Sequence, residues 1–176
     1  MQGLMQDWPL TLDKILDHAK AMAPNREVVT RSVEGPLVRT TYGEIHGRAK
    51  QVTAALKNAG IRLGDRVATL AWNTGRHMEV WFGAQSMGAV LHTLNPRLFP
   101  EQIAWIANHA EDKILFLDLT FVPLVEKIAP QLTTIQRYVI LTDAAHMPQT
   151  TLPNAVAYED FIAGWSTDIA WGGFDE

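Results

Sequence analysis

Four short apolar runs of the chain each end in a polar turn, and these turns are where side chains are placed to bind a charged ligand. The turns lie at residues 72–74, 95–97, 118–120 and 142–143. Arg97 is the only arginine or lysine among them. Its planar guanidinium can form paired hydrogen bonds with phosphate oxygens, which makes Arg97 a candidate cofactor-binding residue. The alternative is that Arg97 forms an ion pair with a carboxylate on the surface.

The histidines and Asp118 do not predict a catalytic or metal site. The six histidines lack the His-x-x-x-His and His-Glu-x-x-His spacings of metal ligands. His92 alternates with apolar residues in one of the runs, so we expect it to lie in the core. Asp118 ends a run, as the acidic residue of a dinucleotide site does, but no Gly-x-Gly-x-x-Gly precedes it. Helix capping is the preferred interpretation of Asp118, and no catalytic residue or metal ligand is predicted.

The remaining candidates have structural explanations. Glu111 and Asp112 follow an amphipathic segment and are expected in a solvated turn. Trp81 and Trp105 lie on apolar helical faces and are expected in the core. Neither Gly-x-Ser-x-Gly nor the Walker-type Gly-x-x-x-x-Gly-Lys occurs in the chain. Residue types and spacing alone therefore predict no active site.

The elements that must position the four turns are the apolar runs themselves, which recur about every 23 to 25 residues. The runs are residues 67–71, 90–94, 114–117 and 138–141, and amphipathic segments at 77–87, 100–110 and 121–132 separate them. Nearly continuous apolar strands joined by helices indicate parallel strands buried on both faces. The fold class predicted is α/β, with a mainly parallel sheet and flanking helices.

The first sixty residues predict a helix, a hairpin and a second helix. Apolar residues share one helical face over residues 12–22, and two short runs at 28–30 and 37–40 flank the turn at 34–36. Thr41 and Glu44 have the spacing of a capping box, which predicts the start of the second helix. Gly60 suits its left-handed end.

Composition bounds the class of protein. The 176 residues are 47% hydrophobic and 19% charged, which is enough apolar material for one domain with a core. The net charge of -4 makes nucleic acid and anionic membranes poor partners. The chain contains no cysteine, which excludes disulfides and thiolate sites. With neither a signal peptide nor a transmembrane run expected, the predicted location is cytoplasmic.

Residues 144–176 break the regular pattern. They are rich in polar loop residues, except for a short helix expected at 158–164, and the end of the chain shows no periodicity. We therefore expect an interrupted domain. Its parts are an arm and first helix at 1–25, an α/β core at 26–143 and a loop-rich tail at 144–176.

The order of several motifs resembles the amino-terminal domain of the adenylate-forming (AMP-binding) superfamily, which includes acyl-CoA synthetases, luciferases and peptide-synthetase adenylation domains. The residues that carry the resemblance are 65–73, 77–84 and 88–98, with residues 41–45 similar to the first core motif of that family. Residues 92–99, 101–103 and 108–113 are most similar to medium-chain fatty-acyl-CoA synthetases. The likeness extends over nearly the whole chain but only the first third or so of a family member.

The resemblance implies a two-step ligase. A fatty acid reacts with ATP and Mg²⁺ to give an acyl-adenylate and pyrophosphate, and the thiol of CoA then displaces AMP. In an aryl-CoA ligase of the family, the arginine of the matching Asn-Pro-Arg-Leu segment contacts a CoA phosphate, a role that falls here to Arg97. The family's Pro-Lys-Gly phosphate loop is absent from the 176 residues. The chain by itself is therefore expected to be inactive and to bind none of ATP, Mg²⁺ or CoA.

Two other hypotheses belong to different classes of protein. The chain would be a free-standing Rossmann-like binding module, or a scaffold without catalysis that dimerises through its amino-terminal arm. The sequence leaves the oligomeric state open, a homodimer included. It also leaves open the acyl chain length of the substrate.

Overall fold

The centre of the molecule is a five-stranded parallel sheet with the strand order β4-β3-β5-β6-β7. The computed structural model describes residues 8–175, so the first seven residues of the predicted arm and Glu176 lie outside it. The sheet consists of β3 (Arg66–Leu70), β4 (Val90–Thr93), β5 (Ile114–Leu117), β6 (Arg137–Ile140) and β7 (Ala155–Ala157). All four neighbouring pairs are parallel. The predicted α/β class and the four predicted strands are confirmed.

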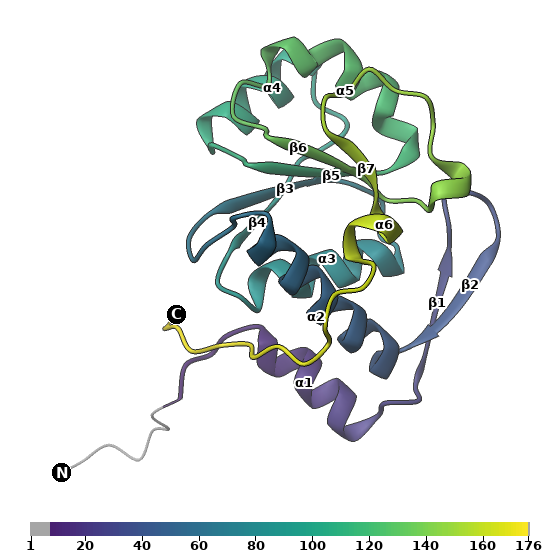
Figure 1. The fold of residues 1–176 in the computed structure, drawn as a ribbon, viewed down its shortest axis with the longest axis vertical. Helices are drawn as coiled ribbons and strands as arrows, with labels where there is room; N and C mark the ends of the chain where they lie inside the picture. The colour runs from purple at the N-terminus through teal and green to yellow at the C-terminus, as the bar shows by residue number, and fades with distance from the viewer. Residues whose placement is uncertain (1–7, 176) are drawn as a thin grey trace.

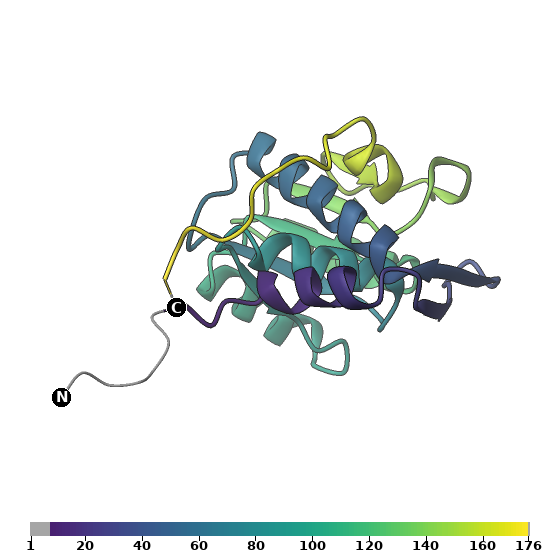
Figure 2. The ribbon, with the colours of Figure 1, turned by 90° about the horizontal axis from the view of Figure 1, so that it is seen from below.

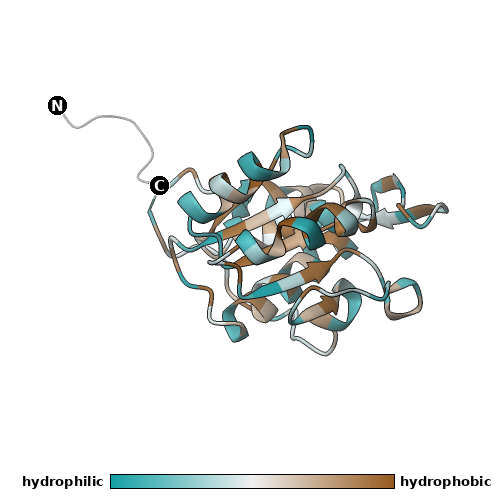
Figure 3. Cartoon of the chain, turned by 90° about the horizontal axis from the view of Figure 1, so that it is seen from above, coloured by the Kyte–Doolittle hydropathy of each residue, from teal (hydrophilic) through white to brown (hydrophobic). Residues whose placement is uncertain are grey.

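Helices cover both faces of this sheet and give the molecule its layers (Figure 1). On one face lie α2 (Tyr42–Asn58), α3 (Gly75–Gln85) and α6 (Tyr158–Ile162), and on the other α4 (Pro100–His109) and α5 (Val122–Ile128). Alternate residues of β5 serve the two cores: Ile114 and Phe116 face α2 and α3, while Leu115 and Leu117 face α4 and α5. Figure 3 shows the strands as mostly hydrophobic ribbons inside the helical layers.

Two strands differ from the sequence-based expectation. The strand β4 lies at an edge of the sheet, so it is not buried on both faces, and Val90 is 49% exposed. The opposite edge strand, β7, lies in the segment predicted as loop-rich tail. Its three residues are too short for a periodic signal, and its pairing with β6 brings together residues about 17 positions apart. The short helix expected after it is confirmed as α6.

The third predicted crossover helix is broken into three pieces. A 3-10 turn, η1 (Leu119–Phe121), leads into the predicted segment 121–132, which then forms α5 and a second 3-10 turn, η2 (Ala129–Gln131). Pro130 lies in η2, where the regular α-helix has already ended. A proline inside an α-helix would remove a hydrogen bond and collide with the preceding turn, which explains the change.

The helix, hairpin and second helix predicted for the first sixty residues are confirmed. Helix α1 (Asp13–Met22) lies against α2 and α3, and β1 (Glu27–Arg31) pairs antiparallel with β2 (Leu37–Thr41) in a separate hairpin. The capping box of α2 is confirmed: the amide of Glu44 donates to the hydroxyl of Thr41, and the carboxylate of Glu44 accepts the amide of Thr41. Gly60 has the expected positive φ of 87°.

The end of the described chain runs back across the helical layer as an extended segment (Figure 2). Trp171 anchors it, because its indole N–H donates to the hydroxyl of Thr53 at 2.8 Å and its ring lies edge-on to His46. The amide of Gly172 donates to the carbonyl of Ser86. A third turn, η3 (Ala144–His146), follows β6. No helix within residues 8–175 is long and apolar enough to span a membrane.

Candidate functional site

The carboxyl ends of the parallel strands meet along one edge of the sheet, next to the β1–β2 hairpin. A pocket of about 330 Å³ lies between this edge, the hairpin and the first turns of α2 and α3. Polar side chains from separate parts of the chain line it, namely Thr30, Ser32, Glu34, Arg39, Thr40, Glu44, Arg48, Thr74, Arg76, Glu79, Asp118 and Glu159. The edge predicted to hold a ligand therefore does carry a polar pocket, but most of its walls come from residues outside the four predicted turns.

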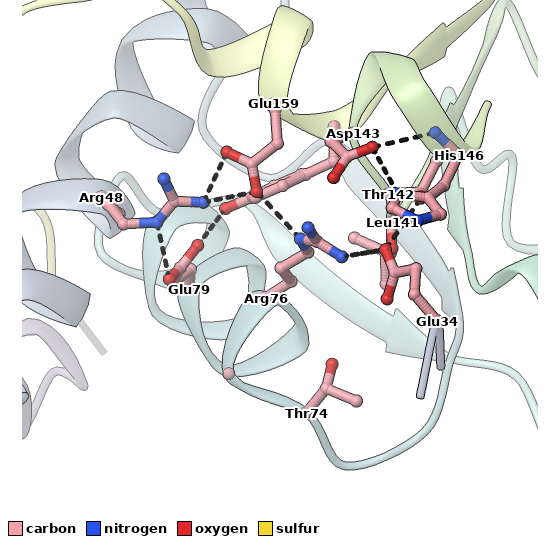
Figure 4. A network of polar contacts seen from close by, with 12 residues as sticks. Glu34, Arg48, Thr74, Arg76, Glu79, Leu141, Thr142, Asp143, His146 and Glu159 are labelled. Carbon is pink, nitrogen blue, oxygen red and sulfur yellow. Dashed lines mark hydrogen bonds and ion pairs between the residues drawn. The ribbon is translucent and has the colours of Figure 1, made fainter. Parts of the chain in front are cut away.

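Two arginines and three glutamates form one ionic network at this pocket (Figure 4). Arg48 of α2 contacts Glu79 of α3 at 2.8 Å and Glu159 of α6 at 3.0 Å. Arg76, in the first turn of α3, contacts Glu159 at 2.9 Å and Glu34 of the hairpin at 2.6 Å. The network thus connects the hairpin with α2, α3 and α6, the three helices of one face.

Because the acids of this network are buried, their pKa values depend strongly on their hydrogen-bond partners. The carboxyl of Glu79 is almost completely buried, and burial raises its pKa, although the hydrogen bonds from Arg48 and Tyr158 oppose that rise. In contrast, the pKa of Glu34 is lowered, because hydrogen bonds from its backbone, Arg76 and Thr142 outweigh the cost of its burial. Removing one partner would leave an uncompensated buried charge, so the network fixes the geometry of the pocket.

Asp118 lies at the end of the central strand β5, and its predicted role as a helix cap is wrong. Its side chain makes no capping bond to η1; instead, Oδ2 accepts the backbone N–H of Trp72 at 2.6 Å. The residue is 1% exposed. Burial raises the pKa of Asp118 to about 6, and the negative charge of Glu34 adds to the rise, while the Trp72 amide and Arg76 oppose it. A direct bond from β5 to the turn after β3 was not foreseen from the sequence.

Arg97 lies apart from this network, in the turn after the edge strand β4. The side-chain oxygen of Asn95 accepts the backbone N–H of Arg97 at 3.0 Å, and the carbonyl of Asn95 accepts the amide of Leu98. Arg97 itself is exposed, and its guanidinium forms no ion pair or hydrogen bond within residues 8–175. The predicted anion-binding side chain is thus at the predicted edge and has no competing partner in that part of the chain.

The other side chains singled out in the sequence have structural environments. His92 is only partly buried, and its Nδ1 lies 2.8 Å from Asp112, whose side chain is fully buried, so the solvated turn predicted for Asp112 is wrong. The core position predicted for Trp105 is also wrong: it is 64% exposed and stacks on His109. Trp81 is partly buried against the small core beneath α1, as expected. No cluster of three or more metal-ligating side chains occurs among the described residues.

The sequence did not single out Arg48, Arg76, Glu79 or Glu159 as site residues. The contacts between them join positions separated by 31 to 111 residues, which no local pattern records. One signal was present, however. Glu79 lies inside an otherwise apolar stretch of its helix, and a charged residue on such a face needs a buried partner.

The fold and this edge define a layered α/β domain with an open parallel sheet and a polar pocket where ligands of such domains bind. The family model of the AMP-binding enzymes matches residues 16–166. The chain therefore belongs to the family of AMP-binding enzymes.

Individual relatives agree with this assignment. The chain is 40% identical over all 176 residues to a 3-methylmercaptopropionyl-CoA ligase of Ruegeria lacuscaerulensis, and covers 33% of that protein. It is 36% identical over 176 residues to a medium-chain-fatty-acid–CoA ligase of Ectopseudomonas oleovorans, and covers 32% of it. The chain thus spans about a third of the length of the curated relatives it matches.

Solved structures share the fold. The anthranilate CoA ligase AuaEII in complex with anthranoyl-AMP superposes with a TM-score of 0.83 at 22% identity, over 98% of this chain and 31% of that one. At this identity the likeness supports the fold alone. The family match and the named relatives do not favour a free-standing Rossmann-like module.

Proposed function

We propose that the chain is the amino-terminal part of an ATP-dependent acid–thiol ligase, an acyl-CoA synthetase. A carboxylate and ATP would give an acyl-adenylate and pyrophosphate; CoA would then take the acyl group as a thioester, and AMP would leave. The observation that carries the proposal is the 40% identity, along the whole chain, to a relative named as a CoA ligase. The same alignment covers only a third of that relative, so the activity is proposed for the longer parent protein.

The acid substrate is proposed to be aliphatic. Relatives matched over all 176 residues are named for 3-methylmercaptopropionate and for medium-chain fatty acids, both of which present a flexible, unbranched chain next to the carboxylate. A fatty acid of medium length is our first choice of substrate. The two arginines of the network at the pocket each pair with two glutamates, and we assign the network no part in choosing among acids.

The proposed co-substrates fit the described residues to different degrees. For CoA, the exposed guanidinium of Arg97 is free to bind a nucleotide phosphate, and the hydrogen bond from the Arg97 amide to Asn95 holds its turn. For ATP, the chain contains no Pro-Lys-Gly phosphate loop. For Mg²⁺, the described residues offer no cluster of three ligands. Arg97 is therefore the only residue of the chain to which we assign a co-substrate, and no step is routed through the metal.

The cellular setting is also a proposal. We place the parent protein in the cytoplasm, because a chain without cysteine fits a reducing compartment. The net charge of -4 argues against nucleic acid as a partner. A homodimer is part of the proposal as well, since Phe99, at the start of α4, and Trp105, within α4, expose large apolar side chains. Light scattering of the purified parent protein tests the dimer.

The function is tested with the full-length parent protein. Purified enzyme is incubated with ATP, MgCl₂, CoA and each of a series of straight-chain acids, with 3-methylmercaptopropionate added to the series. We expect acid-dependent release of AMP and an equal amount of acyl-CoA, both greatest for a medium-chain acid. Failure to form a thioester with every acid, by a folded enzyme, would refute the proposal. A preference for 3-methylmercaptopropionate would correct the substrate and keep the reaction.

A further inference from the structure

The sheet has one point at which its connections reverse direction, and it lies between β3 and β5. From β3 the chain crosses through α3 on one face to β4, whereas from β5 it crosses through α5 on the other face to β6. The carboxyl ends of two such strands separate their loops and leave a crevice that suits small ligands. Here the bond from the Trp72 amide to Asp118 spans the crevice.

One carboxylate oxygen of Asp118 is free to accept a hydrogen bond at this crevice. One of its oxygens takes the Trp72 amide, and the other has no hydrogen bond within residues 8–175, although the residue is 1% exposed and lines the pocket. The charged groups that act on Asp118 are Glu34 of the hairpin and Arg76 of α3. Arg76 already donates to Glu34, to Glu159 and to the carbonyl of Leu141. Arg76 therefore gives its hydrogen bonds to these acceptors and not to Asp118.

The surrounding wall is also rich in acceptors. Five carboxylates and three arginines line the pocket, so these residues together carry a net charge of 3 - 5 = -2. Oε2 of Glu34 has no hydrogen-bond partner among the described residues, and its side chain is 95% buried, since 5% is exposed. A ligand that brings positive charge and N–H donors would match this wall, whereas an anion would not.

We propose that this pocket binds the ammonium group of a small organic cation, with the free oxygen of Asp118 as the acceptor. The volume of about 330 Å³ admits a ligand of a few carbon atoms. An ammonium group carries three donors on a compact charge, which suits an acceptor with hydroxyls of Thr30 and Thr74 in the same wall. The proposal is independent of the proposed ligase activity, because it uses neither Arg97 nor any group assigned to the reaction.

The test is an NMR titration of the 176-residue chain at constant chloride, observed at the backbone amide of Trp72. The probe is n-butylammonium chloride, and tetramethylammonium chloride is the matched control, because it has the charge but no N–H donor. We expect the Trp72 signal to shift and saturate with a roughly millimolar Kd for n-butylammonium only. A probe that causes no saturable shift in the folded protein, or equal shifts from both cations, would overturn the proposal.

Two further arms assign the binding to Asp118. Asp118→Asn keeps an acceptor for the Trp72 amide but loses the charge, and should weaken n-butylammonium binding at least tenfold. Asp143→Asn makes the same change in a half-exposed residue of the turn after β6, outside the pocket lining, and should bind like the unaltered chain. Equal affinity of the unaltered chain and the Asp118 variant would contradict the assignment.

The pH dependence gives an independent check in the unaltered chain. The pKa of Asp118 is raised to about 6, while that of Glu34 is lowered, so between pH 7 and pH 5 Asp118 is the acid of this pair that gains a proton. The cation binds the ionised carboxylate, and its Kd should therefore rise about tenfold over that interval. An unchanged Kd at pH 5 would exclude Asp118 as the acceptor even where the variant fails to fold.

Discussion

At the scale of single residues, the arginines at the carboxyl edge divide into two kinds. Arg48 and Arg76 are partly buried and each contacts two carboxylates, so their positive charges stabilise the contacts between the helices and the hairpin. Arg97 is exposed and forms no ion pair within the part of the chain that the structure describes. An arginine without a partner is available to a ligand phosphate, while a paired one has to give up a stabilising contact first.

The prediction at this scale concerns Arg97 in the parent enzyme. A charge-assisted bond to a CoA phosphate contributes roughly 1.5–3 kcal/mol, so Arg97→Ala should raise the KM for CoA about ten- to a hundredfold. The adenylation half-reaction contains no CoA and should keep nearly its normal rate. Arg97→Lys should restore part of the loss, because it keeps the charge but not the planar fork. CoA titrations beside ATP–pyrophosphate exchange measure both effects.

The contrary outcomes for Arg97 are distinct. If the side chain only stabilises the fold, the variant should melt at a lower temperature, and both half-reactions should fall together. A stable Arg97→Ala enzyme with an unchanged KM for CoA would remove Arg97 from the binding site. That result would leave the ligase proposal itself intact, because thioester formation would still occur.

The sequence predicted Arg97 and missed the network for a physical reason. Arg97 follows an apolar run directly, so the period of the strands is enough to place it at the sheet's edge. The pairing of Arg48 with Glu159 depends on how α2 and α6 pack, and that packing follows from the whole core. Asp118 was located correctly at a strand end, but its partner, the Trp72 amide, depends on β3 and β5 being neighbours.

At the scale of elements, the sequence was sufficient to predict a helix wherever it showed both a helical period of apolar residues and a residue that caps or begins the helix. The capping box began α2 and Gly60 ended it, and α4 begins at Pro100, the first residue of the amphipathic segment predicted at 100–110. The order of the strands in the sheet could not be predicted from such local signals. The sequence shows four similar apolar runs, and only pairing between distant residues places β4 at an edge and admits the three-residue β7.

The prediction at this scale concerns the contact between α2 and α3. A Cβ at Gly83 would lie 2.7 Å from both the carbonyl oxygen of Ala49 and Cβ of Val52, which is closer than real contacts allow. Alanine favours a helix over glycine by about 1 kcal/mol, but overpacking typically costs about 1–3 kcal/mol, and here a backbone oxygen would have to move. We expect Gly83→Ala to lower the free energy of unfolding by up to about 2 kcal/mol, which is the overpacking cost less the gain in helix propensity.

Gly47 provides the matched control, because it lies on the same helix pair but has space. A Cβ at Gly47 would meet only Cγ2 of Thr167, at 3.8 Å. Gly47→Ala should therefore raise the free energy of unfolding by about 0.5–1 kcal/mol through helix propensity alone. Urea denaturation of both variants gives the two values. A Gly83→Ala chain as stable as Gly47→Ala would mean that the helices are not in the close contact described.

At the scale of the whole molecule, the fold and the proposed chemistry cover different lengths of chain. Residues 8–175 form a sheet with helices on both faces and three hydrophobic cores. The curated relatives that are named as ligases are about three times as long as this chain. Whether this chain folds and whether it holds all the groups that the reaction needs are therefore separate questions, and each needs its own measurement.

The last prediction follows from that difference: the 176-residue chain alone should fold but should not catalyse ATP–pyrophosphate exchange with any fatty acid. Transfer at the α-phosphate of ATP requires amides, cations and a metal ion around the phosphates. The chain has no Pro-Lys-Gly loop, and its described residues hold no cluster for a metal. Arg97 is a single cation, and we assign it to CoA. Radiolabelled pyrophosphate exchange should therefore remain at the level of a protein-free blank, while circular dichroism of the same sample shows a cooperative unfolding transition. Exchange above the blank that depends on the added carboxylate would show that the groups for adenylation lie within these residues after all.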